Sequence, residues 1–220
     1  MNKFLSRIIW PVMIAPAAYL VSTWKKIPEN VAMHFDINGN ADRFGSKSEL
    51  LTTTIILSAV NVVIYLLLTN VYRIDPKKYA AENKSRLYRI GFAVSVFMAG
   101  ITCMIVYNAA NSGTRFDVKM VLAGVGLLFA IIGNYLPNMK PNYFAGLRLP
   151  WTLENPDNWK KTHALAGKLW FSGGLLLAIV CLFLTPAASL IVFIAVALII
   201  TLIPAIFSYR YYKQEKKKNI

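Results

Sequence analysis

The chain has 220 residues and a net charge of +14, with 56% of its residues apolar and only 15% charged. Its mean hydropathy is +0.48. A soluble domain contains roughly 45–50% apolar residues, so this excess excludes an ordinary water-soluble protein unless much of the surface faces lipid. A high positive charge can indicate nucleic-acid binding. Here the basic residues gather between apolar runs, where topology signals belong, which argues against direct binding of nucleic acid.

Six apolar stretches are long enough, or nearly so, to cross a bilayer as helices, which takes about 20 residues each. They are residues 8–24, 50–72, 90–110, 120–136, 169–185 and 187–209. None of them contains Asp, Glu, Lys or Arg. The sequence therefore predicts an all-α integral membrane protein with about six transmembrane helices. Pro11, Pro16 and Pro204 fall inside spans, where we expect kinks that neighbouring helices tolerate.

The distribution of Lys and Arg predicts the orientation, because these residues concentrate in cytoplasmic loops. With the N-terminus inside, the inner segments hold 18 basic residues and the outer segments hold 6. Both termini and the largest polar loop are then cytoplasmic. The link at 184–186 is so short that we expect the last two spans to form an antiparallel hairpin.

The first polar segment, residues 25–49, would lie outside the cell. Its alternating Val31, Met33 and Phe35 predict a short strand, and Asn38-Gly39 predicts a turn. Oxygen-bearing side chains recur from Asp36 onwards, but the pattern departs from a calcium-binding loop at its sixth and twelfth positions. We therefore favour a self-hydrogen-bonded turn over calcium, and a structural hydrogen bond over a metal for His34. The candidate external residues are His34, Asp36, Gly39, Asp42 and Lys47.

The second polar segment, residues 73–89, would face the cytoplasm. Its basic residues are Arg73, Lys77, Lys78, Lys84, Arg86 and Arg89. We interpret it as a topology determinant that lies near anionic headgroups, with binding of a partner as the alternative.

The third polar segment, residues 137–168, is called the motif loop below. Three prolines between 137 and 150 exclude a continuous helix, whereas Asn155-Pro156-Asp157 predicts the N-cap and first positions of a new one. Its aromatic residues suit the membrane interface. The loop is either an ordered re-entry segment at the inner mouth of the bundle or a recognition surface for a cytoplasmic partner. The candidate recognition residues are Asn142, Tyr143, Arg148, Trp151, Trp159 and His163.

The sequence of the motif loop resembles that of the SdpI family of bacterial membrane proteins. The matching residues are Gly133-Asn134-Tyr135-x-Pro137, Lys140-Pro141-Asn142-Tyr143-Phe144, Gly146-x-Arg148-x-Pro150-Trp151-Thr152-Leu153, Trp159-x-Lys161-Thr162-His163 and Gly167-Lys168. The external loop is similar to a small domain of unknown function that often precedes this region, through Pro28, His34-Phe35, Gly39, Asp42 and Gly45-Ser46-Lys47. Ala145 and Leu149 depart from the familiar pattern, which has Ile at the first position and often Thr at the second.

This resemblance implies a six-span protein of the bacterial cytoplasmic membrane, in agreement with the hydropathy. It divides the chain into an N-terminal part, residues 1–87, and an SdpI-like part, residues 88–220. The founding member of the family is an immunity protein against a secreted toxic peptide, and it is also a receptor that holds a transcriptional autorepressor at the membrane when toxin is present. The resemblance thus implies immunity or signalling, with the bilayer, an external peptide toxin and a cytoplasmic repressor as partners. It implies no cofactor and no catalytic residue.

The sequence gives less support to two other classes of function. A transporter of peptides or small molecules is the alternative, although ionisable residues that would mark a pathway are missing from the spans. Asn61 and Asn134 are expected to be helix-packing residues instead. An enzyme is disfavoured, because His34 and His163 are predicted on opposite sides of the membrane. In addition, the sequence has no HExxH, GxSxG or GxxxxGK[ST] motif.

Overall fold

A computed structural model describes residues 3–77, 80–111 and 113–218 of the chain. Its six long helices are α1 (Lys3–Thr23), α2 (Lys47–Asn70), α3 (Lys84–Ala110), α4 (Val118–Tyr135), α6 (Pro156–Phe183) and α7 (Pro186–Lys218). All six are long and apolar enough to cross a membrane, so the predicted six-span, all-α fold is confirmed. Lys78, which was counted among the basic residues of the second polar segment, lies outside the described residues.

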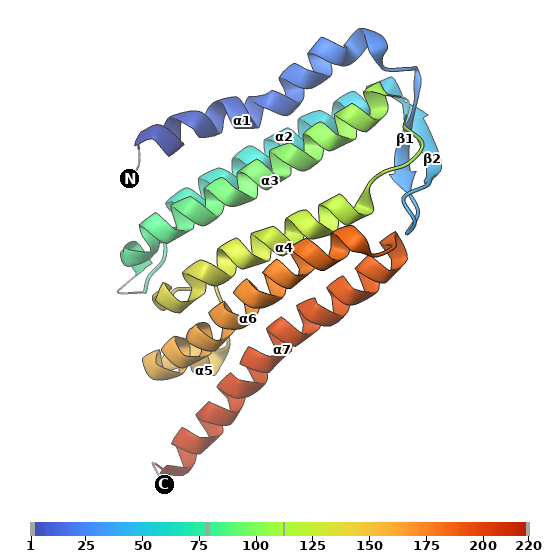
Figure 1. Ribbon diagram of the computed structural model, residues 1–220. Helices are drawn as coiled ribbons and strands as arrows, with labels where there is room; N and C mark the ends of the chain where they lie inside the picture. The colour runs from blue at the N-terminus through green and yellow to red at the C-terminus, as the bar shows by residue number, and fades with distance from the viewer. Residues whose placement is uncertain (1–2, 78–79, 112, 219–220) are drawn as a thin grey trace.

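The bundle has two distinct ends (Figure 1). The start of α1 and the end of α7 lie at one end, called the terminal end below, together with the short helix α5 (Pro150–Glu154). The strands β1 (Asn30–Phe35) and β2 (Ala41–Ser46) lie at the opposite end, called the hairpin end. Short 3₁₀ turns occur at Trp24–Lys26, Val71–Arg73, Ala80–Asn83 and Leu136–Asn138.

The helices form two groups of three. Helices α1, α2 and α3 pack on one another as the N-terminal group, and α4, α6 and α7 pack as the C-terminal group. The two groups meet where α3 lies beside α4 (Figure 1). By packing, the chain therefore divides after α3, whereas the domain division between residues 87 and 88 stays a prediction.

A buried amide connects two helices of the N-terminal group. Asn61 of α2 is 2% exposed, and its Nδ2 donates to the carbonyl of Ser95 on α3 at 3.1 Å. Such a bond between helices is expected where lipid offers no alternative partner, and the packing role predicted for Asn61 is confirmed. The same prediction for Asn134 is wrong, because that side chain is exposed on α4.

Small residues bring α4 and α6 close together. A Cβ added at Gly174 of α6 would overlap backbone atoms of Gly126 and Ala130 on α4, and one added at Gly133 would overlap the backbone of Phe171. Glycine and alanine at such crossings let helix backbones approach closely, which is how membrane helices gain packing energy. These contacts make α4 and α6 the tightest helix pair of the C-terminal group.

The remaining expectations about the spans concern prolines and the closing hairpin. Helices α1 and α7 continue through Pro11, Pro16 and Pro204, as bundled neighbours allow. Helices α6 and α7 pack together on either side of their short link, which confirms the predicted hairpin. The hydroxyl of Ser189 on α7 donates to the carbonyl of Cys181 on α6 at 3.0 Å and ties the hairpin at its tip.

The Gly174→Ala variant tests the crossing of α4 and α6. The added methyl group overlaps the backbone of the facing helix, and overpacking of this kind costs about 1–3 kcal/mol. We expect a lower melting temperature for the detergent-solubilised protein, followed by size-exclusion chromatography after heating. Gly100→Ala is the matched control, because a Cβ at Gly100 meets no atom within 4 Å. Equal melting temperatures for the two variants would contradict the close approach.

Candidate functional site

The motif loop covers the terminal end of the C-terminal group (Figure 1). It begins with the 3₁₀ turn at Leu136–Asn138, contains α5, and ends as the first turns of α6. Asn155 caps α6, since its Oδ1 accepts the N–H groups of Asp157 and Asn158 at 2.9 and 3.0 Å. The helix start predicted from Asn155-Pro156-Asp157 is therefore confirmed.

His163 and Trp159 form the buried centre of the motif loop. The two rings stack with their centroids 3.9 Å apart, and the side chains are 0% and 1% exposed. His163 Nδ1 lies 2.9 Å from the Trp159 carbonyl, which can only accept, so Nδ1 carries the hydrogen. Nε2 then accepts the N–H of Leu147 at 3.1 Å. Both ring nitrogens of a neutral imidazole are thereby used to hold the backbone.

Gly146 is the residue that lets the loop approach this ring. Its φ is +102°, which favours glycine, and a Cβ at this position would overlap Nε2 of His163. The glycine is therefore required both by the backbone conformation and by the close approach to the imidazole.

Three further side chains hold the backbone of the loop. Asn142 is 2% exposed; its Nδ2 donates to two carbonyls, and its Oδ1 accepts the N–H groups of Phe144 and Ala145 at 3.0 and 2.7 Å. Thr152 Oγ1 accepts the N–H of Leu149 at 3.0 Å. The indole of Trp159 donates to the Met139 carbonyl at 2.7 Å. This part of the loop is a compact, internally bonded cap.

The six residues predicted as one recognition surface do not lie on one surface. Asn142, Trp159 and His163 are buried, so their part in the prediction is corrected: they hold the loop and are not accessible to a partner. Tyr143 is 44% exposed, and Arg148 is exposed and donates to the Tyr143 carbonyl at 2.8 Å. These two residues form the accessible part of the candidate surface, whose role in recognition stays a prediction.

Trp151 occupies an intermediate position against the end of α7. Its indole N–H donates to Ser208 Oγ, and its ring packs beside Tyr209 and Tyr212 with centroid separations of 5.2 and 5.9 Å. Trp151 is only partly exposed as a result. The residues of α7 were missed by the sequence analysis, because nothing local to them indicates which distant side chain they contact.

The link between α2 and α3 is bonded to the motif loop, which the sequence analysis also missed. Asp75 Oδ2 accepts the N–H of Tyr143 at 2.8 Å. The fully buried Asn83 exchanges two bonds with the backbone of Lys140, at 3.0 and 2.8 Å. Lys77 Nζ donates to the Leu153 carbonyl at 2.9 Å. The segment interpreted as a topology determinant thus also joins the two helix groups at the terminal end.

At the hairpin end, β1 and β2 form an antiparallel pair with Gly39 at φ +82° in the turn. Asp36 Oδ1 accepts the N–H groups of Asn38 and Asn40 at 2.9 and 2.8 Å. These backbone bonds, that of Asn40 first, hold the pKa of Asp36 below its ordinary value. The predicted self-hydrogen-bonded turn is confirmed. Among the described residues, no three Asp, Glu, His or Cys side chains cluster as a metal site would require.

The other candidate external residues have structural partners. His34 Nδ1 lies 2.6 Å from Asp42 Oδ1 in a pair that is exposed on both sides, which confirms a structural hydrogen bond for this histidine. The ammonium group of Lys47 lies 4.5 Å from the ring centroid of Trp24. Gly39 is buried, whereas His34 and Asp42 are the exposed members of the set.

The hairpin is also bonded to the link between α3 and α4. The N–H of Ala41 donates to Thr114 at 2.8 Å, and the N–H of Phe116 donates to Gly39 at 2.7 Å. Arg115 Nε donates to Asn40 Oδ1 at 3.0 Å. Residues 114–116 thus lie along the hairpin like a short third strand, so this end of the molecule also joins the two groups.

Comparison with known proteins relates both ends to known sequences. Residues 138–208, which include all but the first residue of the motif loop, match the SdpI/YfhL protein family. Residues 12–58, which include the hairpin, match a domain of unknown function, DUF1648. Over 164 residues, 73% of this chain and 75% of the relative, the chain is 26% identical to "Immunity protein SdpI" of Bacillus subtilis (strain 168). No solved structure matches the chain.

The His163→Phe variant tests the hydrogen bonds of the motif loop separately from its packing. Phenylalanine keeps the stacked ring but leaves the N–H of Leu147 without its acceptor, which costs about 1–3 kcal/mol for a buried group. We expect faster proteolysis within residues 140–150 of the solubilised protein. Lys160→Ala, an exposed change on the same helix, is the control and should match the unsubstituted chain. If the His163 variant were cleaved no faster than the unsubstituted chain, the hydrogen bond from the Leu147 N–H would be dispensable.

Proposed function

We propose that this multi-pass bacterial membrane protein is an immunity protein against a secreted peptide toxin. The premise is that a DUF1648 region is followed along the chain by an SdpI/YfhL region. The observation that carries the proposal is the similarity to an immunity protein along most of both chains. The structure adds that each matched region contains an ordered polar segment at one end of the bundle.

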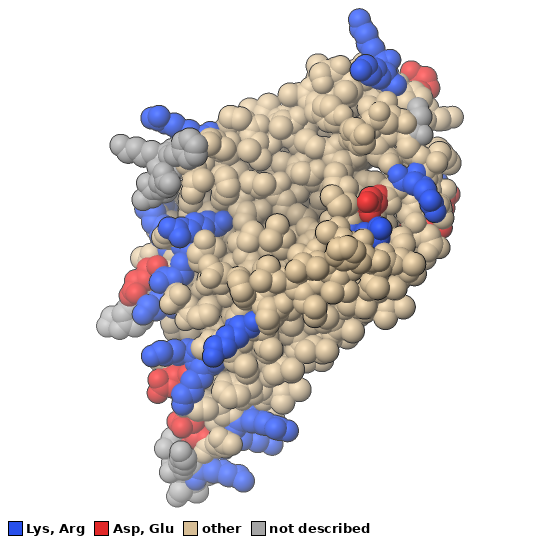
Figure 2. All heavy atoms as spheres, in the orientation of Figure 1, with Lys and Arg blue, Asp and Glu red and all other residues tan. Residues whose placement is uncertain are grey.

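The orientation that suits this function places the hairpin end outside the cell. Figure 2 shows Lys and Arg side chains concentrated towards the terminal end, with fewer at the hairpin end. Basic residues favour the cytoplasmic side. The hairpin then meets the toxin, and the motif loop faces the cytoplasm.

The hairpin offers an apolar surface to a toxin that arrives from outside. Ile37 in the turn and Phe44 of β2 are 50% and 55% exposed. The exposed pair of His34 and Asp42 lies in the same hairpin. We infer that the toxin is an apolar peptide that contacts Ile37 and Phe44 at the membrane surface.

The motif loop is the second contact surface in this proposal. Tyr143 and Phe144 are 44% and 42% exposed at the terminal end, next to the exposed Arg148. An aromatic and arginine patch is typical of protein interfaces, so the cytoplasmic partner, a repressor, would bind here. Toxin binding would control this partner only if the toxin binds two arrangements of the bundle unequally.

Survival of toxin-sensitive cells that lack their own immunity tests the two surfaces separately. The chain itself should protect such cells, and unchanged killing across several related peptide toxins would remove the immunity proposal. Ile37→Ser with Phe44→Ser should reduce protection at least about thirtyfold, since loss of interface anchors costs more than about 1 kcal/mol each. Tyr143→Ala with Arg148→Ala is the matched control: it should retain protection and release the repressor from the membrane fraction.

Cysteine labelling tests the proposed orientation. In intact cells, a membrane-impermeant maleimide should label Asn38→Cys at the hairpin turn. It should label Tyr143→Cys only after permeabilisation. The native Cys103 and Cys181 lie inside spans and give the background of the unsubstituted chain. Labelling of the Tyr143 variant in intact cells would reverse the orientation and both assigned surfaces with it.

A further inference from the structure

An apolar groove of about 300 Å³ runs between the two helix groups, where α3 lies beside α4. Phe92, Val96 and Phe97 of α3 line one wall, and Gly124, Leu127 and Ile131 of α4 line the other. Glycine at position 124 leaves room there, because an added Cβ would press on the ring of Phe97. The groove lies within two membrane-spanning helices, so it opens towards lipid and not towards water.

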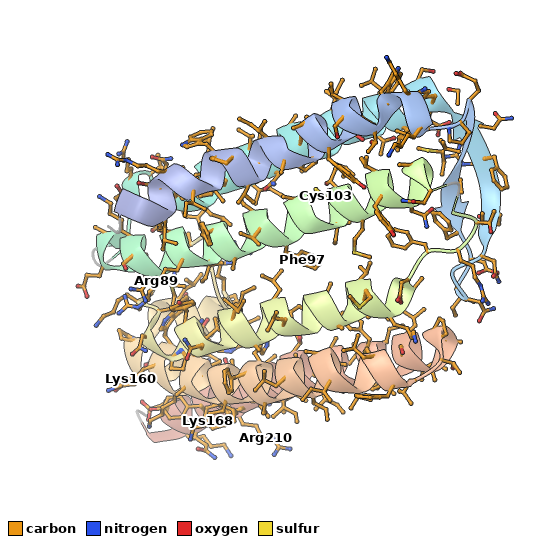
Figure 3. All side chains as sticks on the ribbon, turned by 45° about the horizontal axis from the view of Figure 1, so that its top comes forward. Arg89, Phe97, Cys103, Lys160, Lys168 and Arg210 are labelled. Atoms are coloured by element: carbon orange, nitrogen blue, oxygen red, sulfur yellow. The ribbon has the colours of Figure 1, made fainter. Side chains whose placement is uncertain are left out.

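Arg89 stands at the terminal end of this groove. Residues three, four and seven positions apart share a helix face, so Arg89 lies on the same side of α3 as the groove residues Phe92 and Val96. Figure 3 shows Arg89 near the start of α3 and Phe97 farther along the same helix. Arg89 is exposed and forms no ion pair or hydrogen bond with any of the described residues. No described residue therefore compensates its charge.

A second cavity, of about 430 Å³, adjoins Arg89 at the start of α3. Lys84 and Ser85 also line it, together with Leu5 of α1. The carboxylate on its rim, Glu82, lies 3.6 Å from Lys140 Nζ. The ammonium group of Lys84 is 5.2 Å from the centroid of the Tyr72 ring. This cavity, which Arg89 shares with Lys84, therefore carries a net positive charge.

The stretch of α3 from Arg89 to Gly100 is about as long as one leaflet of a bilayer is thick. From Arg89 to Gly100 the helix rises about 16 Å, at about 1.5 Å per residue. The hydrocarbon core is about 30 Å thick, so one leaflet accounts for about half of it. Gly100 is exposed, and a Cβ there meets no atom within 4 Å, so open space continues to that level.

We propose that this face of α3 binds one anionic phospholipid. Its acyl chain would lie in the groove between α3 and α4, and its phosphate would lie at Arg89, next to the positively charged cavity that Arg89 also lines. Charge complementarity selects the headgroup, since Arg89 has no partner among the residues that the structure describes. The size of the groove selects an acyl chain: a peptide helix about 10–12 Å wide fills more than about 1,000 Å³ over a length of about 16 Å, whereas the groove holds about 300 Å³.

Native mass spectrometry of the full chain in detergent tests this site. Added phosphatidylglycerol should be retained in preference to phosphatidylcholine. Arg89→Gln should lower that retention about fivefold, the effect of one basic residue near an anionic surface. Val96→Trp should lower it by filling the groove. The controls are Arg210→Gln, an exposed arginine of α7, and Val63→Trp, an exposed change on α2; both should retain the lipid.

The outcomes separate a built site from ordinary surrounding lipid. Equal retention of the two lipids, or equal losses in the variants and their controls, would overturn the proposal. Melting temperatures identify any variant that fails to fold. Arg89→Gln removes the charge at the end of the groove, and Val96→Trp fills the groove itself. Each variant is therefore a separate test of lipid binding. The test contains no toxin, so its result is independent of the immunity proposal.

Discussion

The bond from the Leu147 N–H to Nε2 of His163 addresses the main difficulty of this fold, which is non-helical backbone near the membrane. Backbone groups that leave a helix at this depth must find partners within the protein. The imidazole accepts from the loop with one nitrogen and donates to the Trp159 carbonyl with the other. Asn142 and Thr152 provide the remaining local partners. Gly146 is the residue that makes this arrangement sterically possible.

Once the motif loop is ordered, it can connect parts of the chain that pack weakly elsewhere. The N-terminal and C-terminal groups meet mainly where α3 lies beside α4, and a groove separates part of that boundary. At the terminal end, Asp75 and Asn83 bond the first group to the loop. At the hairpin end, Arg115 and its neighbours bond to β2 and to the turn before it. The ends of the bundle are therefore better connected than its middle.

The sequence predicts the features that depend on local chemistry. Uncharged apolar length predicts the spans, Asn155-Pro156 predicts the start of α6, and Asn38-Gly39 predicts the turn between β1 and β2. It does not predict which aromatic and polar residues of the motif loop are buried, because Trp and His suit an interface as well as a core. The bonds of Asp75 and Asn83 were missed for a related reason: their partners lie about 60 or more residues away.

The weak middle and the connected ends bear on how a signal could cross the membrane. If the two helix groups move against each other as rigid bodies, the hydrogen bonds that join them at both ends must rearrange with that motion. A ligand at either end can then favour one arrangement of the groups. A lipid in the groove between α3 and α4 would resist the same motion, because its chain would contact both groups. Binding at the hairpin and binding in the groove would then be linked, and each would alter the affinity of the other by the same factor. The lipid composition of the membrane would thus influence how strongly the two ends of the protein communicate.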